Sequence, residues 1–156
     1  GADLNWVTDK SDNLNILAGL LTKLINLDII TMVYIQGKAI GGAIGLISTF
    51  DFAVAANNST FQTPEISLGI TPKIITPYLV RTLGMQAAKK MLLTADEMSA
   101  AEALNLTLIT AIIAPDSFLK HQQNFIAATL KKDFDSIKAT KKLLLKTSNN
   151  SLSMKS

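Results

Sequence analysis

Apolar positions along the first third of the chain predict a helix followed by a buried strand. Between residues 11 and 27 apolar side chains recur every three or four positions, which is the spacing of one helix face. These are Leu14, Leu17, Leu21, Leu24 and Ile25. The run from Ile29 to Ile35 is apolar at odd and even positions alike, which predicts a strand in a sheet covered on both sides.

Glycine and proline divide the rest of the chain into short alternating elements. We expect a turn at 37–42, a buried helix from about Gly42, a buried strand at 52–56, and an irregular or edge-like segment at 61–70. Thr76 and Pro77 predict a helix start and Gly84 a helix stop. Further expected elements are helices at 85–93 and 99–106, a strand at 108–113, and amphipathic helices at 116–130 and 134–147.

Alternating helices and strands are typical of an α/β fold. A capping box of Ser99 and Glu102 supports the helix expected at 99–106. The side chains expected in the core are Leu17, Leu21, Leu24, Val33, Ile35, Leu46, Phe52, Val54 and Ile109.

Composition excludes several classes of site and protein. The 156 residues are 48% hydrophobic and 17% charged, with one histidine and no cysteine. That excludes a disordered chain, a disulfide framework and a thiolate metal centre, and we expect no metal site. The apolar fraction exceeds what a lone soluble domain needs, so we expect part of the surface to be covered by a partner subunit or by missing chain.

The most apolar stretch is not expected to enter a membrane. Residues 29–50 hold one charge, Lys38, and three glycines at GxxxG spacing. Lys38 stands near the middle, where a charge is costly in a membrane, and the stretch begins as a β-branched strand. Residues 1–7 lack the basic and apolar regions of a signal peptide, and we expect a cytoplasmic protein.

Positive charge is concentrated near the C-terminus. Residues 131–156 hold seven lysines and two aspartates, a net +5, whereas the other 130 residues carry −2. Such a cluster is either a solvated helix face or a surface for an anionic partner. A single arginine, Arg81, and little aromatic interleaving argue against nucleic acid.

Two local features are candidates for chemistry. At Gly41-Gly42 a strand enters a helix, which leaves backbone N–H groups free for an anion or a developing oxyanion, unless the glycines serve only close packing. Glu65 is the only acidic residue between Asp51 and Asp96 and follows Pro64 in an apolar stretch. It is either a general acid/base with a raised pKa or an ordinary surface residue on a turn.

Read together, several segments resemble the signatures of the crotonase family, the enoyl-CoA hydratases and isomerases. They are GADLNW, IQGKAIGGAIGLISTFDFAVAANNSTFQTPEISLGITP, GMQAAKKMLLTADEMSAAEALNL and LITAIIAP, in the family's order. The resemblance implies a crotonase-like α/β fold of stacked ββα units, with the family's first strands missing. It divides the chain into a partial core at 1–115, which holds the thioester site, and a helical oligomerisation segment at 116–156. Family chains are longer, so the chain is expected to be truncated at both ends.

The resemblance also implies an acyl-CoA substrate, no separate cofactor, and a homotrimer or hexamer. In the family two backbone N–H groups hold the thioester oxygen as it becomes an enolate. The matching residues are Ala2 and Gly42, and the matching substrate-binding residues are Ala2, Asp3, Leu4, Gly41 and Gly42. Thr107 stands where the family usually has a glycine, and a β-branched residue is unfavourable there if φ is positive.

Only one of the family's two catalytic carboxylates is present. Glu65 matches the second, whereas Gly45 stands at the position of the first. Three readings stay open: an enoyl-CoA hydratase, a Δ3,Δ2-enoyl-CoA isomerase with a single glutamate, and a catalytically weak homologue that binds CoA esters. Gly45 and the segment LGITPKIITPYLVRTLG are most similar to the 3-methylglutaconyl-CoA hydratase branch of leucine breakdown, so we rank hydration first.

Overall fold

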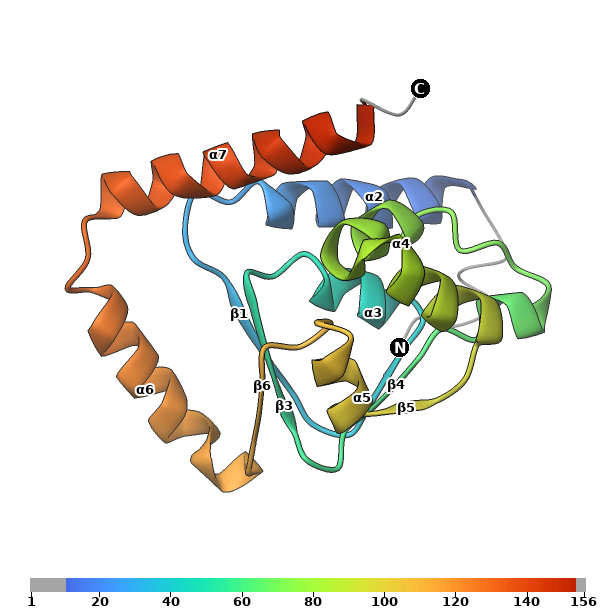
Figure 1. The fold of residues 1–156 in the computed structure, drawn as a ribbon, viewed down its shortest axis with the longest axis horizontal. Coiled ribbons are helices and arrows are strands. Elements are labelled where there is room, and N and C mark those ends of the chain that lie inside the picture. The colour runs from blue at the N-terminus through green and yellow to red at the C-terminus, as the bar shows by residue number, and fades with distance from the viewer. Residues whose placement is uncertain (1–10, 154–156) are drawn as a thin grey trace.

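Two small sheets and the helices around them form the fold (Figure 1). The structure is a computed structural model that describes residues 11–153, with side chains described for residues 14–148. The elements are α2 (Ser11–Ile25), β1 (Met32–Ile35), β2 (Lys38–Ile40), α3 (Gly42–Ile47), β3 (Phe52–Ala56), β4 (Thr60–Gln62), the 3-10 turn η1 (Glu65–Leu68), α4 (Thr76–Thr94), β5 (Met98–Ser99), α5 (Ala100–Asn105), β6 (Ala111–Ile113), the 3-10 turn η2 (Pro115–Ser117), α6 (Phe118–Thr129) and α7 (Phe134–Ser153).

Successive ββα units give one strand to each sheet. β1, β3 and β6 form a parallel sheet in that order, and β2, β4 and β5 form the second sheet. β2 and β4 are parallel, with Ile40 opposite Gln62, and β5 is antiparallel to β4. The unit β1-β2-α3 is followed by β3-β4-α4, so that each helix starts beyond the ends of the second sheet's strands.

The sequence predicts some of these elements closely and misses others. The strand at 52–56, the helix from Gly42 and the capping box of Ser99 and Glu102 are confirmed. The turn expected at 37–42 is wrong, because it contains strand β2. The irregular or edge-like segment expected at 61–70 is also wrong in part, since β4 is the middle strand of its sheet and only the residues after it are irregular.

Two helix boundaries depend on residues in unusual positions. Ile75 rather than Thr76 is the N-cap of α4, and the Thr76 hydroxyl donates to the Pro72 carbonyl at 2.7 Å. Gly84 interrupts α4 with φ 75° and ψ 165°, which confirms the stop expected there. Thr107 has φ 63°, so this β-branched residue does adopt the left-handed conformation that is unfavourable for its type.

The core lies between the sheets and α2, α3, α4 and α5. Of the expected core side chains, Leu21, Ile35, Val54 and Ile109 are buried, and Leu17, Leu24, Val33 and Leu46 are half-buried. Phe52 is the exception at 36% exposed. It lies at the start of β3 on the face that carries α6, where its ring meets the Phe125 ring edge-on, with centroids 5.2 Å apart.

α6 covers the face of the β1-β3-β6 sheet that is turned away from the core. The apolar run at 29–35 predicted such a sheet, covered on both faces. Figure 1 shows α6 on one side of β1, β3 and β6, and α3, α4 and α5 on the other. The ring of Tyr34 packs against Phe118, with centroids 5.0 Å apart, and its hydroxyl is 2.8 Å from Nδ1 of His121. A hollow of about 260 Å³ separates β1 from the second half of α6.

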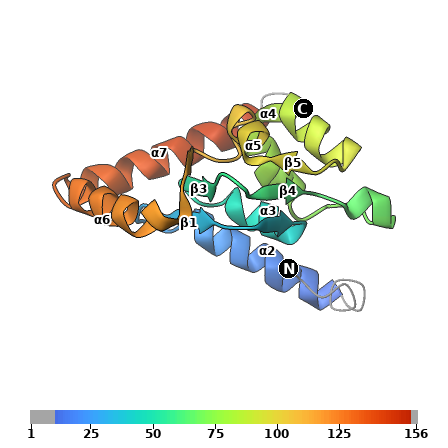
Figure 2. The same ribbon diagram turned by 90° about the horizontal axis from the view of Figure 1, so that it is seen from below.

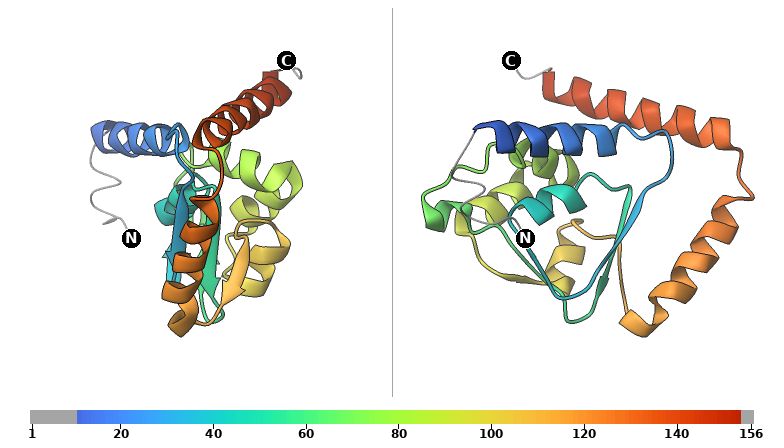
Figure 3. Two further views of the ribbon diagram at one scale, coloured as in Figure 1. Left: turned by 90° about the vertical axis from the view of Figure 1, so that its left-hand side faces the viewer. Right: turned by 180° about the vertical axis from the view of Figure 1, so that it is seen from behind.

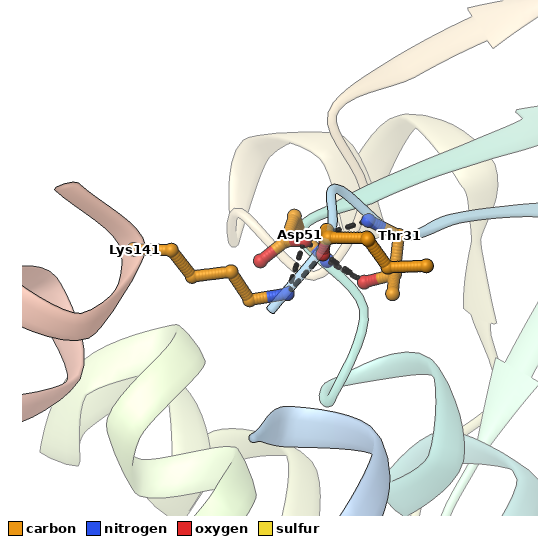
Figure 4. Close-up of polar contacts among 4 residues, drawn as sticks. Thr31, Asp51 and Lys141 are labelled. Atoms are coloured by element: carbon orange, nitrogen blue, oxygen red, sulfur yellow. Dashed lines mark hydrogen bonds and ion pairs between the residues drawn. The ribbon is translucent and has the colours of Figure 1, made fainter. Parts of the chain in front are cut away.

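A buried ion pair attaches α7 to the sheet. Both views of Figure 3 place α7 beside α2 at one end of the molecule. Lys141 Nζ donates to Asp51 Oδ2 at 2.7 Å and to the Ile29 carbonyl at 2.8 Å, and Thr31 donates to the same Asp51 oxygen (Figure 4). Because Ile29 and Asp51 precede β1 and β3, one lysine joins α7 to the beginnings of two strands.

We expect Lys141→Met to lower the free energy of unfolding by about 2–3 kcal/mol. Removing one partner of a buried pair leaves a charge uncompensated, which typically costs about 3–5 kcal/mol. Asp51 keeps its hydrogen bonds from Thr31 and its side chain is 27% exposed to solvent, so we expect a loss at or below the lower end of that range. The control is Lys142→Met: the Lys142 side chain is 59% exposed, and its ammonium lies 3.4 Å from Asp28 Oδ1. Denaturant unfolding should show a loss below about 1 kcal/mol for the control. Equal losses would mean that Lys141 does not hold α7.

Candidate active site

The two candidate features of the sequence meet where β2 and β4 end. The strands are parallel, so their carboxyl ends lie at the same edge, and Gly41 follows one as Thr63 follows the other. The Gly41 N–H donates to the Gln62 carbonyl at 2.8 Å, which continues the ladder one residue beyond β2. This pairing brings the glycine pair of residues 41–42 beside the segment that carries Glu65.

Gly41 is required by both its conformation and its neighbour. Its φ of 59° lies in the region that favours glycine. A Cβ atom built on Gly41 would lie 3.1 Å from Oε1 of Glu65, closer than nearly all real contacts of that kind. The Glu65 carboxyl therefore lies directly against the backbone of Gly41, at the start of α3.

Gly42 provides the backbone N–H at the first position of α3. The first N–H groups of a helix have no acceptor within it, and they carry the positive end of the helix dipole. The N-cap residue Gly41 has no side chain that could accept from them. Leu17 of α2 packs beside Gly42, since a Cβ there would lie 3.6 Å from Cδ2 of Leu17. The arrangement suits an oxygen that gains negative charge.

Several hydrogen bonds fix the segment around Glu65. The Gln62 amide donates to the Ala95 carbonyl at 3.0 Å, and the buried Thr63 hydroxyl donates to the Met91 carbonyl at 2.8 Å. After η1, the Ile70 N–H donates back to the Glu65 carbonyl at 2.8 Å. The segment is thus tied to the end of α4, and Glu65 sits on a defined turn rather than a loose one.

The Glu65 carboxyl is half-buried and poorly satisfied. Its Oε2 is buried and has no hydrogen-bond partner among the described residues. Burial raises the pKa of this carboxyl above the ordinary glutamate value, and a hydrogen bond from its own backbone N–H opposes the shift only in part. A carboxyl with a raised pKa beside the uncapped first turn of a helix is an arrangement that suits a general acid/base.

We expect Glu65→Gln to gain thermal stability over the wild type as the pH rises from 3 to 7. With its pKa raised in the folded state, Glu65 stabilises the fold while protonated, and this contribution is lost as the pH rises through the folded pKa. The control is Glu97→Gln. Lys38 lowers the pKa of Glu97, so that variant should instead lose stability relative to the wild type as the pH rises. Unfolding midpoints that run parallel for wild type and Glu65→Gln would contradict the raised pKa.

The other predicted site residues are not tested by the geometry. Ala2, Asp3 and Leu4 lie outside the described residues.

Within residues 11–153 no cluster of histidine, aspartate or glutamate side chains could hold a metal ion. No helix in the same range is long and apolar enough to cross a membrane. The hollows beside α6 and α7 are not lined by Glu65 or Gly42.

Comparison with known proteins identifies the family to which this geometry belongs. The sequence matches the enoyl-CoA hydratase/isomerase family over residues 4–156. The chain belongs to the enoyl-CoA hydratase/isomerase family. Its α/β fold of ββα units with C-terminal helices is the crotonase fold, as the sequence motifs predicted.

Individual relatives agree with the enoyl-CoA hydratase/isomerase family. The chain is 36% identical over 99 residues to a crotonyl-CoA hydratase of Syntrophomonas wolfei. That alignment covers 63% of this chain and 38% of the hydratase. It is 34% identical over 127 residues to the enoyl-CoA isomerase/hydratase fer4 of Mycosarcoma maydis. That alignment covers 77% of this chain and 46% of fer4. A crystal structure of an enoyl-CoA hydratase from Shewanella pealeana superposes with a TM-score of 0.88 and 34% identity, over 96% of this chain and 59% of that one.

The chain spans between 38% and 59% of the length of these three relatives. Their names include both hydratases and an isomerase/hydratase, so the family match does not select one reaction. A residue that the sequence analysis missed lies close to the site: Ile75, at the start of α4, packs against Gly45. The glycine at position 45 of an otherwise apolar helix was the available signal for a tight contact at this point.

Proposed function

We propose that the protein carrying this chain is an enoyl-CoA hydratase, which adds water to an α,β-unsaturated acyl-CoA thioester. The observation that carries the proposal is the contact of the Glu65 carboxyl with Gly41, next to the Gly42 N–H at the start of α3, which no side chain of the N-cap residue caps. A base and an oxyanion donor at one place are what addition to a conjugated thioester requires.

In the proposed reaction Glu65 moves one proton twice. As a carboxylate it takes a proton from water while the hydroxyl oxygen bonds to C3 and the double-bond electrons move onto the thioester oxygen. The Gly42 N–H stabilises that enolate oxygen, and Ala2 N–H is proposed as the second donor. The Glu65 carboxyl then returns its proton to C2, so that water has been added across C2 and C3.

The acyl group is a finer proposal. With one carboxylate present, a substrate that brings a carboxylate of its own can help to position or activate water. We therefore propose 3-methylglutaconyl-CoA, an intermediate of leucine breakdown, as the first substrate to test. Asp3, Leu4 and Gly41 are proposed to contact the substrate together with the two oxyanion donors.

Isomerisation is the second candidate because Gly45 removes the second acid. In that reaction Glu65 takes a proton from C2 of a 3-enoyl-CoA and returns it to C4, and the double bond moves into conjugation. The third candidate is a catalytically weak homologue that binds CoA esters.

The organisation of the chain is also proposed. Residues 1–115 are the core with the thioester site, and residues 116–156 are an oligomerisation segment of a cytoplasmic homotrimer or hexamer. Large apolar side chains exposed on α6, at its C-cap and on α7 support the second part, among them Leu119, Ile126, Leu130, Leu143 and Leu144. We propose no separate cofactor and no nucleic-acid partner.

The test is an assay of the complete protein on two kinds of substrate, a conjugated enoyl-CoA and a 3-enoyl-CoA. Hydration consumes the conjugated enoyl absorbance of crotonyl-CoA or 3-methylglutaconyl-CoA, whereas isomerisation of a 3-enoyl-CoA creates it. We expect hydration to be the faster reaction. Faster isomerisation would select the second candidate, and binding of the CoA ester without either reaction would select the third.

A further inference from the structure

Gly45 and Ile75 fit together as a pair. A Cβ atom built on Gly45 would overlap Cγ2 of Ile75 and lie 2.9 Å from its Cβ, although it would lie 3.6 Å from its Cα. Ile75 is 3% exposed, and Gly45 is buried within α3. Position 45 can therefore carry no side chain while Ile75 keeps its own in place. The same construction on Gly19, in α2, meets nothing within 4 Å.

This pair lies one helical turn from the candidate acid/base. Gly41 and Gly45 are four residues apart, which corresponds to a rise of about 6 Å along α3. Glu65 contacts α3 at Gly41, and Ile75 contacts it at Gly45. Figure 2 shows α3 between α2 on one side and α4 on the other, so Ile75 fills the α4 side of the short helix whose first N–H is the proposed oxyanion donor.

We propose that Ile75 is a specificity-determining residue, whose side chain fills the volume that an acid at position 45 would need and so keeps a second acid from standing beside Glu65 at this position. This rests on the proposed function. The isoleucine side chain occupies this volume against Gly45 and leaves no room there for the water that a second acid would hold. Ile75 therefore lowers the rate of hydration relative to isomerisation, because isomerisation needs one carboxyl and no water.

The structure specifies the variants that test this pairing. Gly45→Glu introduces the acid against Ile75, and Gly45→Glu/Ile75→Gly introduces it with room, because the Ile75 Cα is at an ordinary contact distance. Ile75→Gly alone shows the effect of removing the Ile75 side chain without adding an acid. Gly19→Glu, in open space on α2, is the matched control for adding a glutamate to a helix.

Two measurements on the complete protein separate packing from specificity. We expect Gly45→Glu to lower the thermal midpoint more than Gly19→Glu, and the double variant to recover part of that loss. We also expect the ratio of the hydration rate to the isomerisation rate in the double variant to exceed that of the wild type and of Ile75→Gly at least tenfold, as added acid–base catalysis typically supplies 10²–10⁴-fold. If the double variant lost as much in thermal midpoint as the two single variants together, Gly45 and Ile75 would not be packed as a pair.

A milder variant keeps the proposal testable if the double variant does not fold. Ile75→Thr retains a branched side chain and places a hydroxyl against Gly45, where it can hold water, so the ratio should rise at least threefold. Ile109→Thr changes an equally buried isoleucine elsewhere in the core and should leave the ratio unchanged. An unchanged ratio in the folded Ile75 variants would overturn the role in specificity. A wild type inactive on every enoyl-CoA would instead refute the proposed function. The thermal midpoints of Gly45→Glu, Ile75→Gly and the double variant would still test whether Gly45 and Ile75 pack as a pair.

Discussion

Glu65→Gln is expected to lower the turnover of an unsaturated acyl-CoA by about 10²–10⁴-fold while the substrate binds almost as before. The substitution keeps the size of the side chain but removes its ability to transfer a proton, and general acid–base catalysis is typically worth that factor. Binding should change little because the thioester oxygen is proposed to be held by backbone N–H groups. Steady-state rates and direct binding of the CoA ester, both measured on the complete protein, separate the two effects.

The control for this loss is Glu97→Gln, an exposed glutamate paired with Lys38 on β2. It changes the same charge in the same part of the fold without touching the candidate site, so its turnover should match the wild type. A Glu65→Gln variant with wild-type turnover would mean that Glu65 is only a turn residue. The one-carboxylate mechanism would then be wrong.

Gly42→Pro is expected to lower turnover by about 10²–10³-fold, whereas Gly42→Ala should stay close to the wild type. Proline lacks the N–H, and losing one oxyanion donor typically costs about 3 kcal/mol of transition-state stabilisation. The first position of a helix is where proline is best tolerated, so α3 should persist. Alanine keeps the N–H, and its Cβ would meet Leu17 at an ordinary 3.6 Å.

The pair of variants distinguishes chemistry from packing. Both add atoms next to Leu17, but only one removes the donor. Circular dichroism and thermal midpoints should be similar for the two, while their turnover should differ by the stated factor. Equal turnover in Gly42→Pro and Gly42→Ala would show that the Gly42 N–H does not stabilise the enolate.

The sequence predicted the separate features of the site but not what joins them. Gly41-Gly42 and Glu65 were identified as a helix start with free N–H groups and as an acid in an apolar stretch. Their contact depends on the pairing of β2 with β4, two strands of three residues each. Strands so short show no hydrophobic alternation, and the first was mistaken for a turn because it lies between glycines.

Long elements and those with local signals were predicted best. The strand at 52–56 and the capping box of Ser99 and Glu102 follow from patterns within a few residues. The contact of Gly45 with Ile75 joins positions thirty residues apart and has no local signature. The exposure of Phe52 likewise depends on how much of its face α6 covers, which no local pattern specifies.

Exchange of the proton on C2 of a saturated acyl-CoA tests the central claim most directly. Hydration and isomerisation both place negative charge on the thioester oxygen, so the exchange requires Glu65 and Gly42 whatever the natural acyl group is. Butyryl-CoA would be incubated with the complete protein in deuterium oxide, and its mass followed with time. We expect the wild type and Gly42→Ala to exchange the proton for deuterium, and Glu65→Gln and Gly42→Pro to do so at least about a hundredfold more slowly. Exchange at the same rate in all four proteins, or no exchange by the wild type, would contradict an enolate formed between Glu65 and Gly42.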